Sequence, residues 1–151
     1  MLTWRWDGKS TFHSYLESSA PVYIFEQGKS RFAAVEFTGD VANRNLIITL
    51  GSKKIETKQS IFYPAATFLD KNKKKISSDE IEILAIGSAD SFTQAIAKIS
   101  VPEGAKYVII HSAQTNFGQM GAVTVDSGRS ASVSHAYLNS PSAAIHLKLE
   151  P

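Results

Sequence analysis

Histidine is the side chain best suited to metal binding or proton transfer near neutral pH, and the chain has four: His13, His111, His135 and His146. No two of them stand in an H-x-H or H-x-x-x-H pattern, the spacings that place two imidazoles on one face of a strand or helix. The chain also has no cysteine to supply thiolate ligands. We therefore expect no metal site, with His146 on a solvent-facing side of a strand and His111 at the end of a strand.

The carboxylates and serines form no complete catalytic motif. Glu80 and Glu82 would share one face of a strand, but neighbouring outward acids usually form a solvated face. The sequence contains no G-x-S-x-G elbow, no phosphate-binding glycine loop and no acidic calcium loop. We therefore predict a protein that is not an enzyme and needs no cofactor. The less favoured alternative is a hydrolase with a dispersed site, drawn from His111, His135, Asp126 and Glu103.

Aromatic residues are the better candidates for ligand contact, because a flat apolar ring matches the C–H face of a sugar ring. The candidates for such a platform are Trp4, Trp6, Tyr15, Tyr23 and Tyr63. Aromatic side chains of a β domain more often pack in its core, so exposure decides between the two roles. Of the five, we predict Trp4, Trp6 and Tyr63 as the ligand-binding residues. A carbohydrate-binding module predicts that Trp4, Trp6 or Tyr63 is exposed on one face, and burial of all three in the core would exclude it.

The elements that would position these residues are strands. Segments rich in β-branched and aromatic residues, separated by Gly, Pro, Asn, Asp and Ser, predict antiparallel strands. The predicted strands are residues 21–25, 31–37, 45–50, 60–69, 80–86, 91–101, 105–112, 121–125 and 144–150. Residues 80–86 and 91–101 are also compatible with short helices. Closely spaced strands without βα alternation favour a mainly β fold, a two-sheet antiparallel β-sandwich of jelly-roll-like type, with residues 1–151 as a single domain.

Four segments carry more specific predictions. Pro64 should lie at an edge, at a bulge or at the first position of a strand beginning at Ala65. Residues 70–75 hold five charged residues and should form an exposed turn. The apolar run at 107–110 predicts a central strand that is buried on both faces. In the last predicted strand the alternation places Ile145, Leu147 and Leu149 toward the interior.

The overall charge argues against two classes of partner. The 151 residues include 16 Lys and Arg against 14 Asp and Glu, which gives a net charge of +2. This balance supplies little long-range attraction for nucleic acid or for an anionic membrane. The apolar runs are much shorter than the ~20 residues of a membrane-spanning helix. We therefore expect no nucleic-acid partner, and membrane association only through an N-terminal anchor that would precede Met1.

The chain resembles the β-sandwich part of the MalM family, the maltose-operon periplasmic proteins. The resemblance rests on Leu2-Thr3-Trp4 and on residues 45–50, 61–72, 97–102, 107–110 and 144–149. These are mostly core patterns, so they imply shared architecture more than shared activity. The family implies a periplasmic setting, with lipid anchoring of some members as lipoproteins, and it offers no catalytic residues to carry over. The lysine-rich turn at residues 71–75 departs from the family pattern.

These features together predict a function of the binding class. We expect a non-enzymatic periplasmic or cell-envelope accessory domain of MalM type that contacts an envelope protein or a glycan. The main alternative is a carbohydrate-binding module that uses exposed aromatic residues.

Overall fold

The computed structural model describes residues 3–16, 22–25, 28–53, 60–88, 92–112, 120–126, 132–139 and 143–150. Within these ranges the chain forms strands and no helix. The strands are β1 (Thr3–Trp6), β2 (Phe12–Leu16), β3 (Val22–Phe25), β4 (Gly28–Phe37), β5 (Asn45–Lys53), β6 (Ser60–Ile61), β7 (Pro64–Leu69), β8 (Lys75–Glu80), β9 (Ile83–Ser88), β10 (Phe92–Ser100), β11 (Tyr107–Ser112), β12 (Met120–Asp126), β13 (Ser132–Asn139) and β14 (Ala143–Glu150).

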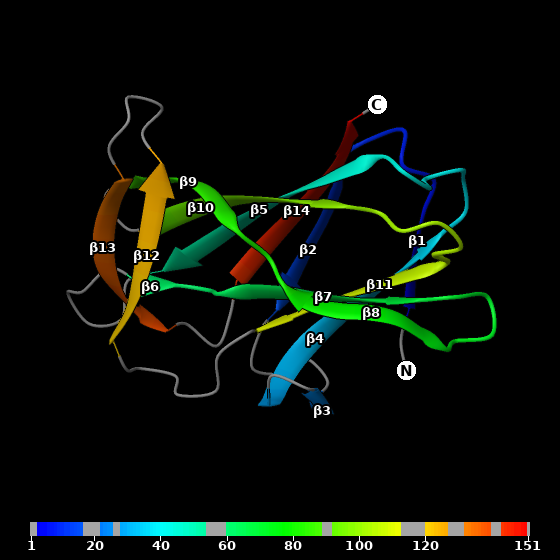
Figure 1. Cartoon of the computed structure of the whole chain (residues 1–151), viewed down its shortest axis with the longest axis horizontal. Coiled ribbons are helices and arrows are strands. Elements are labelled where there is room, and N and C mark those ends of the chain that lie inside the picture. The colour runs from blue at the N-terminus through cyan, green and yellow to red at the C-terminus, as the bar shows by residue number, and fades with distance from the viewer. Residues whose placement is uncertain are drawn as a thin grey trace.

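Two sheets pack face to face as a sandwich (Figure 1). The first sheet has the order β1-β4-β11-β7-β8, with β3 also paired to β4. The second sheet has the order β2-β14-β5-β10-β9. The chain passes from one sheet to the other between β8 and β9, where the buried side chain of Ile81 lies in the core. The predicted mainly β, two-sheet sandwich is confirmed.

The core between the sheets follows from the alternation of side chains along each strand. Large apolar residues from both sheets meet in one cluster, which includes Val35, Phe37, Phe68, Val108, Leu46, Ile48, Ile145 and Leu147. The predicted inward positions Ile145, Leu147 and Leu149 are buried. The predicted central strand is β11, which lies between β4 and β7 and is buried along most of its length. Burial of this apolar area is the main favourable term in folding.

Two pairings depart from the predicted antiparallel arrangement. β1 pairs with β4 in parallel, and β13 pairs with β6 in parallel. In each case intervening strands separate the two partners along the chain, so the returning segment can enter the sheet in the same direction. β6, β12 and β13 form a small third sheet, and β12 and β13 lie at the left end of the view in Figure 1.

The sequence prediction missed four strands and misplaced some boundaries. β1, β2, β8 and β13 were not predicted, because each carries at most one β-branched residue. The predicted strand at 80–86 is wrong as a single element, because β8 ends at Glu80 and β9 begins at Ile83. Pro64 is itself the first residue of β7, where a strand tolerates a residue without an N–H group.

The charged segment after β7 forms the predicted exposed turn, except that Lys75 already belongs to β8. Asp70 organises it: its side-chain oxygen accepts hydrogen bonds from the backbone N–H groups of Asn72 at 2.8 Å and Lys74 at 2.9 Å. Lys73 adopts a positive φ of 61° within this turn. An aspartate at the start of a turn commonly bonds its own backbone in this way.

Candidate functional site

The three predicted ligand-binding residues do not lie together on one face. Trp4 on β1 is 51% exposed, whereas Trp6 on the same strand is only 5% exposed. The Trp6 ring packs between Phe12 and Phe37 at centroid distances of 6.2 and 6.1 Å, and its Nε1–H donates to the backbone oxygen of Ser10 at 2.7 Å. Trp6 is therefore a core residue.

Tyr63 also has a packing role. It is half-buried in the link between β6 and β7 and packs against Ile83 and Ala95 near the free edge of the second sheet. β1, which carries the two tryptophans, lies instead at the edge of the first sheet. The structure therefore does not assemble Trp4, Trp6 and Tyr63 into one binding platform.

A shallow hollow of about 390 Å³ lies beside the end of β1. Its lining residues are Arg5, Trp6, Asp7, Ser10 and Thr38. Their polar groups are largely engaged within the protein. An Asp7 carboxylate oxygen accepts the backbone N–H of Lys9 at 2.9 Å, and the Ser10 carbonyl accepts the Trp6 indole N–H. These committed partners make the hollow a poor candidate for ligand recognition.

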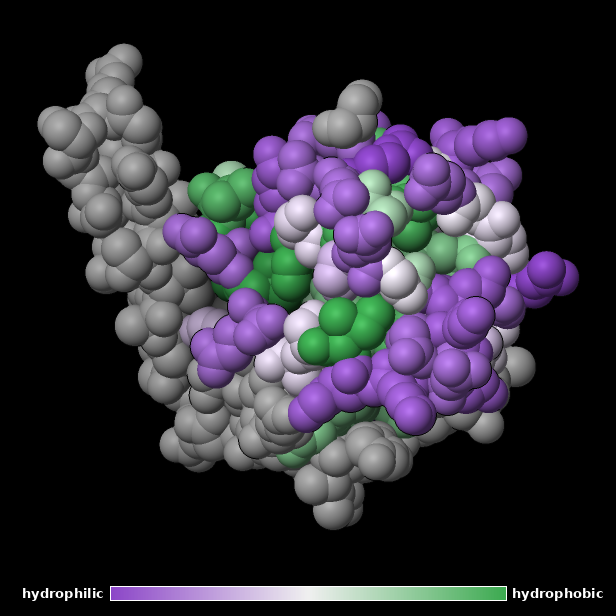
Figure 2. Space-filling view, turned by 45° about the vertical axis from the view of Figure 1, so that its right-hand side comes forward, coloured by the Kyte–Doolittle hydropathy of each residue, from purple (hydrophilic) through white to green (hydrophobic). Residues whose placement is uncertain are grey.

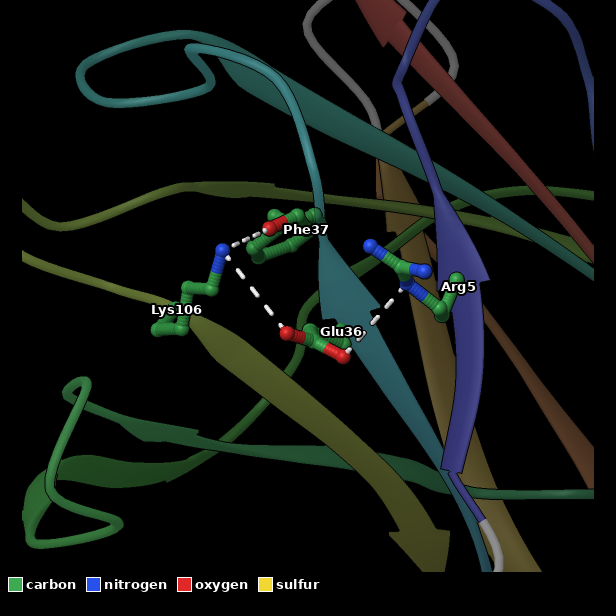
Figure 3. Close-up of polar contacts among 4 residues, drawn as sticks. All are labelled: Arg5, Glu36, Phe37 and Lys106. Atoms are coloured by element: carbon green, nitrogen blue, oxygen red, sulfur yellow. Dashed lines mark hydrogen bonds and ion pairs between the residues drawn. The ribbon is translucent and has the colours of Figure 1, made fainter.

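The charged residues next to this hollow form a small surface network (Figure 3). Glu36 on β4 lies between Arg5 on β1, at 3.9 Å, and Lys106 just before β11, at 3.8 Å. The Lys106 ammonium also donates to the backbone oxygen of Phe37 at 2.8 Å. Because these side chains are partly exposed, each pair contributes about 0–1 kcal/mol to stability. We assign this network a role in holding β1 and β11 against β4.

The outward face of the second sheet offers a more open surface. Its outward side chains are exposed or half-buried, among them His13, Tyr15, Thr49, Gln94, Ile96, Ala144 and His146. The outward face of the first sheet differs, because Ala34, Ala65 and Ile109 there are buried. Of the two sheets, the second therefore presents its outward face to solvent.

Tyr15 marks one end of a row that crosses this face. The ladder pairs Tyr15 with Ala144, Ala144 with Gly51, Gly51 with Gln94, and Gln94 with Gly87. We call these five residues the Tyr15 row. Tyr15 is 68% exposed, and the next two residues are small. A Cβ atom added to Gly51 would meet only the Cβ of Ala144, at 3.7 Å, and one added to Gly87 would meet nothing within 4 Å. Open space therefore lies beside the phenol ring.

The next row on the same face contains a pair of histidines. His13 and His146 stand directly opposite each other, and their ring centroids lie 4.3 Å apart at an interplanar angle of 70°. Partial burial lowers the pKa of His146 below its usual value, and the neighbouring His13 lowers it further. Within the part of the chain that the structure describes, His13, Thr49 and Gln94 form no side-chain hydrogen bond or ion pair. These polar groups can therefore face a ligand.

Sequence reasoning named Tyr15 as a candidate aromatic but did not select it. The signal was present in Phe12-His13-Ser14-Tyr15-Leu16, where alternation puts Tyr15 out of phase with the apolar Phe12 and Leu16. Leu16 is buried and Tyr15 is exposed, as this phase requires. The prediction that His146 faces outward is confirmed, since it is half-buried on the outward face of β14.

His111 lies at the end of β11, as predicted, but it is fully buried. Its Nε2 lies 2.9 Å from the Thr67 hydroxyl, which in turn lies 2.8 Å from the Ser78 hydroxyl. Its Nδ1 lies 3.2 Å from the carbonyl oxygen of Ser112, which can only accept, so Nδ1 carries the proton and Nε2 accepts from Thr67. The ring stacks on Phe25 at 3.7 Å and 4°. Burial lowers the pKa of His111 to about 4, against a small opposing effect of the Ser112 bond.

The other candidate residues do not gather around His111. Glu103 is exposed in the turn before β11, and Glu80 and Glu82 are exposed around the β8–β9 crossing. The side chains of Asp126 and His135 lie outside the described part of the chain. Among the residues that the structure does describe, no three His, Cys, Asp or Glu side chains come together as a metal-ligand group.

The surface drawn in Figure 2 shows how exposed apolar residues are distributed on one side of the molecule. Hydrophobic areas are separated from one another by hydrophilic side chains. Contiguous exposed apolar patches of more than a few hundred Å² often mark protein-interaction surfaces. This side of the molecule therefore offers scattered apolar contacts among polar groups.

No protein-family model, no curated protein and no solved structure matches the chain. The described ranges also contain no helix that is long and apolar enough to cross a membrane. The fold and the outward face of the second sheet are therefore the features that bear on function.

Proposed function

We propose that this chain is a non-enzymatic binding domain of the cell envelope that recognises a glycan on the outward face of its second sheet. The observation that carries the proposal is the Tyr15 row, in which a 68% exposed aromatic ring stands beside the small residues Ala144 and Gly51. A sugar ring placed against the phenol face would lie over these two residues without displacing a side chain.

The chemistry of the row suits a sugar better than it suits an apolar ligand. The flat tyrosine ring provides an apolar surface for the C–H face of a pyranose. Gln94 in the same row, with His13 and Thr49 in the next, provides donors and acceptors for hydroxyl groups. A site with one stacking ring and a few polar groups on a preformed strand surface has the composition expected of a small-ligand site.

We place this role in the periplasm, with lipoprotein anchoring as one way to hold the domain at the membrane. The support for this setting is the resemblance to the MalM family in residues 45–50, 61–72 and 144–149. The absence of cysteine throughout the chain is compatible with an oxidising compartment. A binding role on an exposed sheet face also agrees with an accessory domain that has no chemistry of its own.

The test is a glycan-array screen of the purified domain, followed by calorimetric titration with the sugars that bind. Tyr15→Ala should weaken binding by about 5–30-fold, because a lost stacking contact is worth roughly 1–2 kcal/mol. Gly51→Val should weaken it as well, because the new side chain fills the space beside Tyr15. Both variants should keep the stability of the parent, since both positions lie on the exposed face.

Trp4→Ala is the matched control, because Trp4 is also an exposed aromatic residue but belongs to the first sheet. It should bind the sugar as the parent does. If Trp4→Ala loses binding and Tyr15→Ala retains it, the Tyr15 row is not the site. If nothing on the array binds, the glycan proposal fails and a protein partner in the envelope takes its place.

A further inference from the structure

The two histidines on the open face come from distant parts of the sequence. β2 carries His13 and β14 carries His146, and the ladder places them directly opposite each other. Side chains at such positions project from the same face with Cβ atoms about 4.5–5.5 Å apart. The ring centroids lie 4.3 Å apart, slightly closer than the Cβ atoms expected at such paired positions.

We propose that His13 and His146 together chelate one transition-metal ion. Imidazole nitrogen is a common ligand for zinc, nickel and copper, with metal–nitrogen distances of about 2.0–2.1 Å for zinc. Each ring nitrogen lies little more than a bond length from its ring centre. With centroids 4.3 Å apart, rotation of the two side chains brings one nitrogen from each ring within bonding distance of a shared ion.

The surroundings of the pair permit this rotation. His13 is exposed and His146 is half-buried, and no hydrogen bond or ion pair in the described part of the chain holds either ring. Among the described residues, Thr49 lies beside His146 in the histidine row, and Tyr15, Ala144 and Lys148 lie two residues along β2 and β14 on the same face. None of these is a carboxylate, imidazole or thiolate, so water would complete the coordination. The site would thus be open and exchangeable, unlike a closed four-ligand structural zinc site.

This arrangement explains why the sequence patterns did not indicate a metal site. H-x-H and H-x-x-x-H detect ligands that one element places on one face, whereas this pair depends on the register between β2 and β14. Since β2 is the outer strand of the second sheet and pairs with β14, an ion held by both histidines would tie that edge strand to the sheet. Metal binding would therefore also raise resistance to unfolding.

The experiment is a calorimetric titration of the full chain with nickel chloride, with magnesium chloride as a negative control. Nickel should bind at one ion per chain and raise the thermal unfolding midpoint, whereas magnesium, which prefers oxygen ligands, should do neither. His13→Gln and His146→Gln should each weaken nickel binding by at least about 10-fold, because chelation needs both rings.

Lys148→Ala is the control on the same face of the same strand, and it should retain nickel binding. Circular dichroism of each glutamine variant shows whether it remains folded. Absence of nickel binding to the parent chain would overturn the proposal, as would equal binding by the parent and both glutamine variants. The inference does not depend on the glycan proposal, because Tyr15→Ala removes the stacking ring and should leave nickel binding intact.

Discussion

The imidazole of His111 is held from three directions: by the Thr67 hydroxyl at Nε2, by the Ser112 carbonyl at Nδ1, and by the Phe25 ring against its face. Protonation of Nε2 would replace an acceptor with a donor and so disturb the bond from Thr67. It would also place a charge in a site without solvent. The neutral ring is therefore part of the folded structure.

This environment predicts a loss of stability in mild acid. The unfolded chain takes up a proton at His111 near pH 6.5, whereas the folded chain does so only near its pKa of about 4. Stability should therefore be fully present above pH 6.5 and fall as the pH drops from 6.5 to about 4, by on the order of 3 kcal/mol. Urea unfolding of the parent chain and of His111→Phe, at intervals between pH 7 and pH 4, measures this difference.

The phenylalanine variant keeps a ring that can stack on Phe25 but has no group that titrates in this range. Titrations elsewhere in the molecule affect both proteins alike, so the difference between the two curves isolates His111. Curves that stay parallel from pH 7 to pH 4 would mean that His111 titrates normally in the folded state.

For single residues, the sequence predicts which face of a strand a side chain occupies better than it predicts what the side chain does. Alternation placed His146 outward correctly, and the position of His111 at a strand end was also correct. The choice of Trp6 as a ligand-binding residue stays a prediction, but sequence alternation did not show that its ring packs between Phe12 and Phe37. Burial of an aromatic residue on an edge strand depends on what packs across it, and a linear pattern does not contain that information.

The short connection between β1 and β2 is constrained at Gly8 by the backbone conformation and by a close neighbour. Gly8 has a φ of +78°, a conformation that other residues adopt at a cost. A Cβ atom at this position would lie 2.5 Å from Cδ1 of Leu149, whose side chain is buried. The connection between β1 and β2 thus packs directly on β14.

We expect Gly8→Ala to destabilise the fold by about 1–3 kcal/mol, from backbone strain and from displacement of Leu149. The matched control is Gly87→Ala on β9, where an added Cβ meets no atom within 4 Å. Its free energy of unfolding should stay within about 0.5 kcal/mol of the parent value. Denaturant unfolding of both variants makes the comparison, and equal losses would show that the contact with Leu149 does not matter.

The strands that the sequence predicted well are those with strong apolar patterns. Asn45–Lys53, Tyr107–Ser112 and Ala143–Glu150 were found because one or both of their faces lie in the core. β1, β2, β8 and β13 were missed because each carries at most one β-branched residue and so lacks the pattern that marks a strand. Such strands form because a neighbouring strand already offers unpaired backbone groups, which is a property of the sheet and not of the segment.

At the scale of the whole molecule, stability depends on the layer between the two sheets. Neighbouring residues of β5 test this, because Ile48 points into the core and is fully buried, whereas Ile47 lies on the outward face and is half-buried. Ile48→Ala should lower the free energy of unfolding by about 2–5 kcal/mol. Ile47→Ala should lower it by about 1 kcal/mol or less. Equal losses, measured by urea unfolding, would contradict the assignment of the two faces.

The sandwich class itself was predictable from regular strand spacing and from the absence of βα alternation. The pairing of the strands was not, because it depends on contacts between residues far apart in the chain. The parallel pairing of β1 with β4 is an example, and so is the pairing of β2 with β14. The candidate site shares this limit, since the Tyr15 row draws its members from β2, β14, β5, β10 and β9.

The place of β14 in the second sheet has a consequence for synthesis of the protein. β14 lies between β2 and β5, so two strands made early must wait for residues 143–150 before either has its partner there. Until residues 143–150 have left the ribosome, the open edge of β5 would be available for wrong pairing. We therefore expect the second sheet to complete only after β14 has emerged, and a chain stalled before residue 143 to be a target for chaperones and proteases.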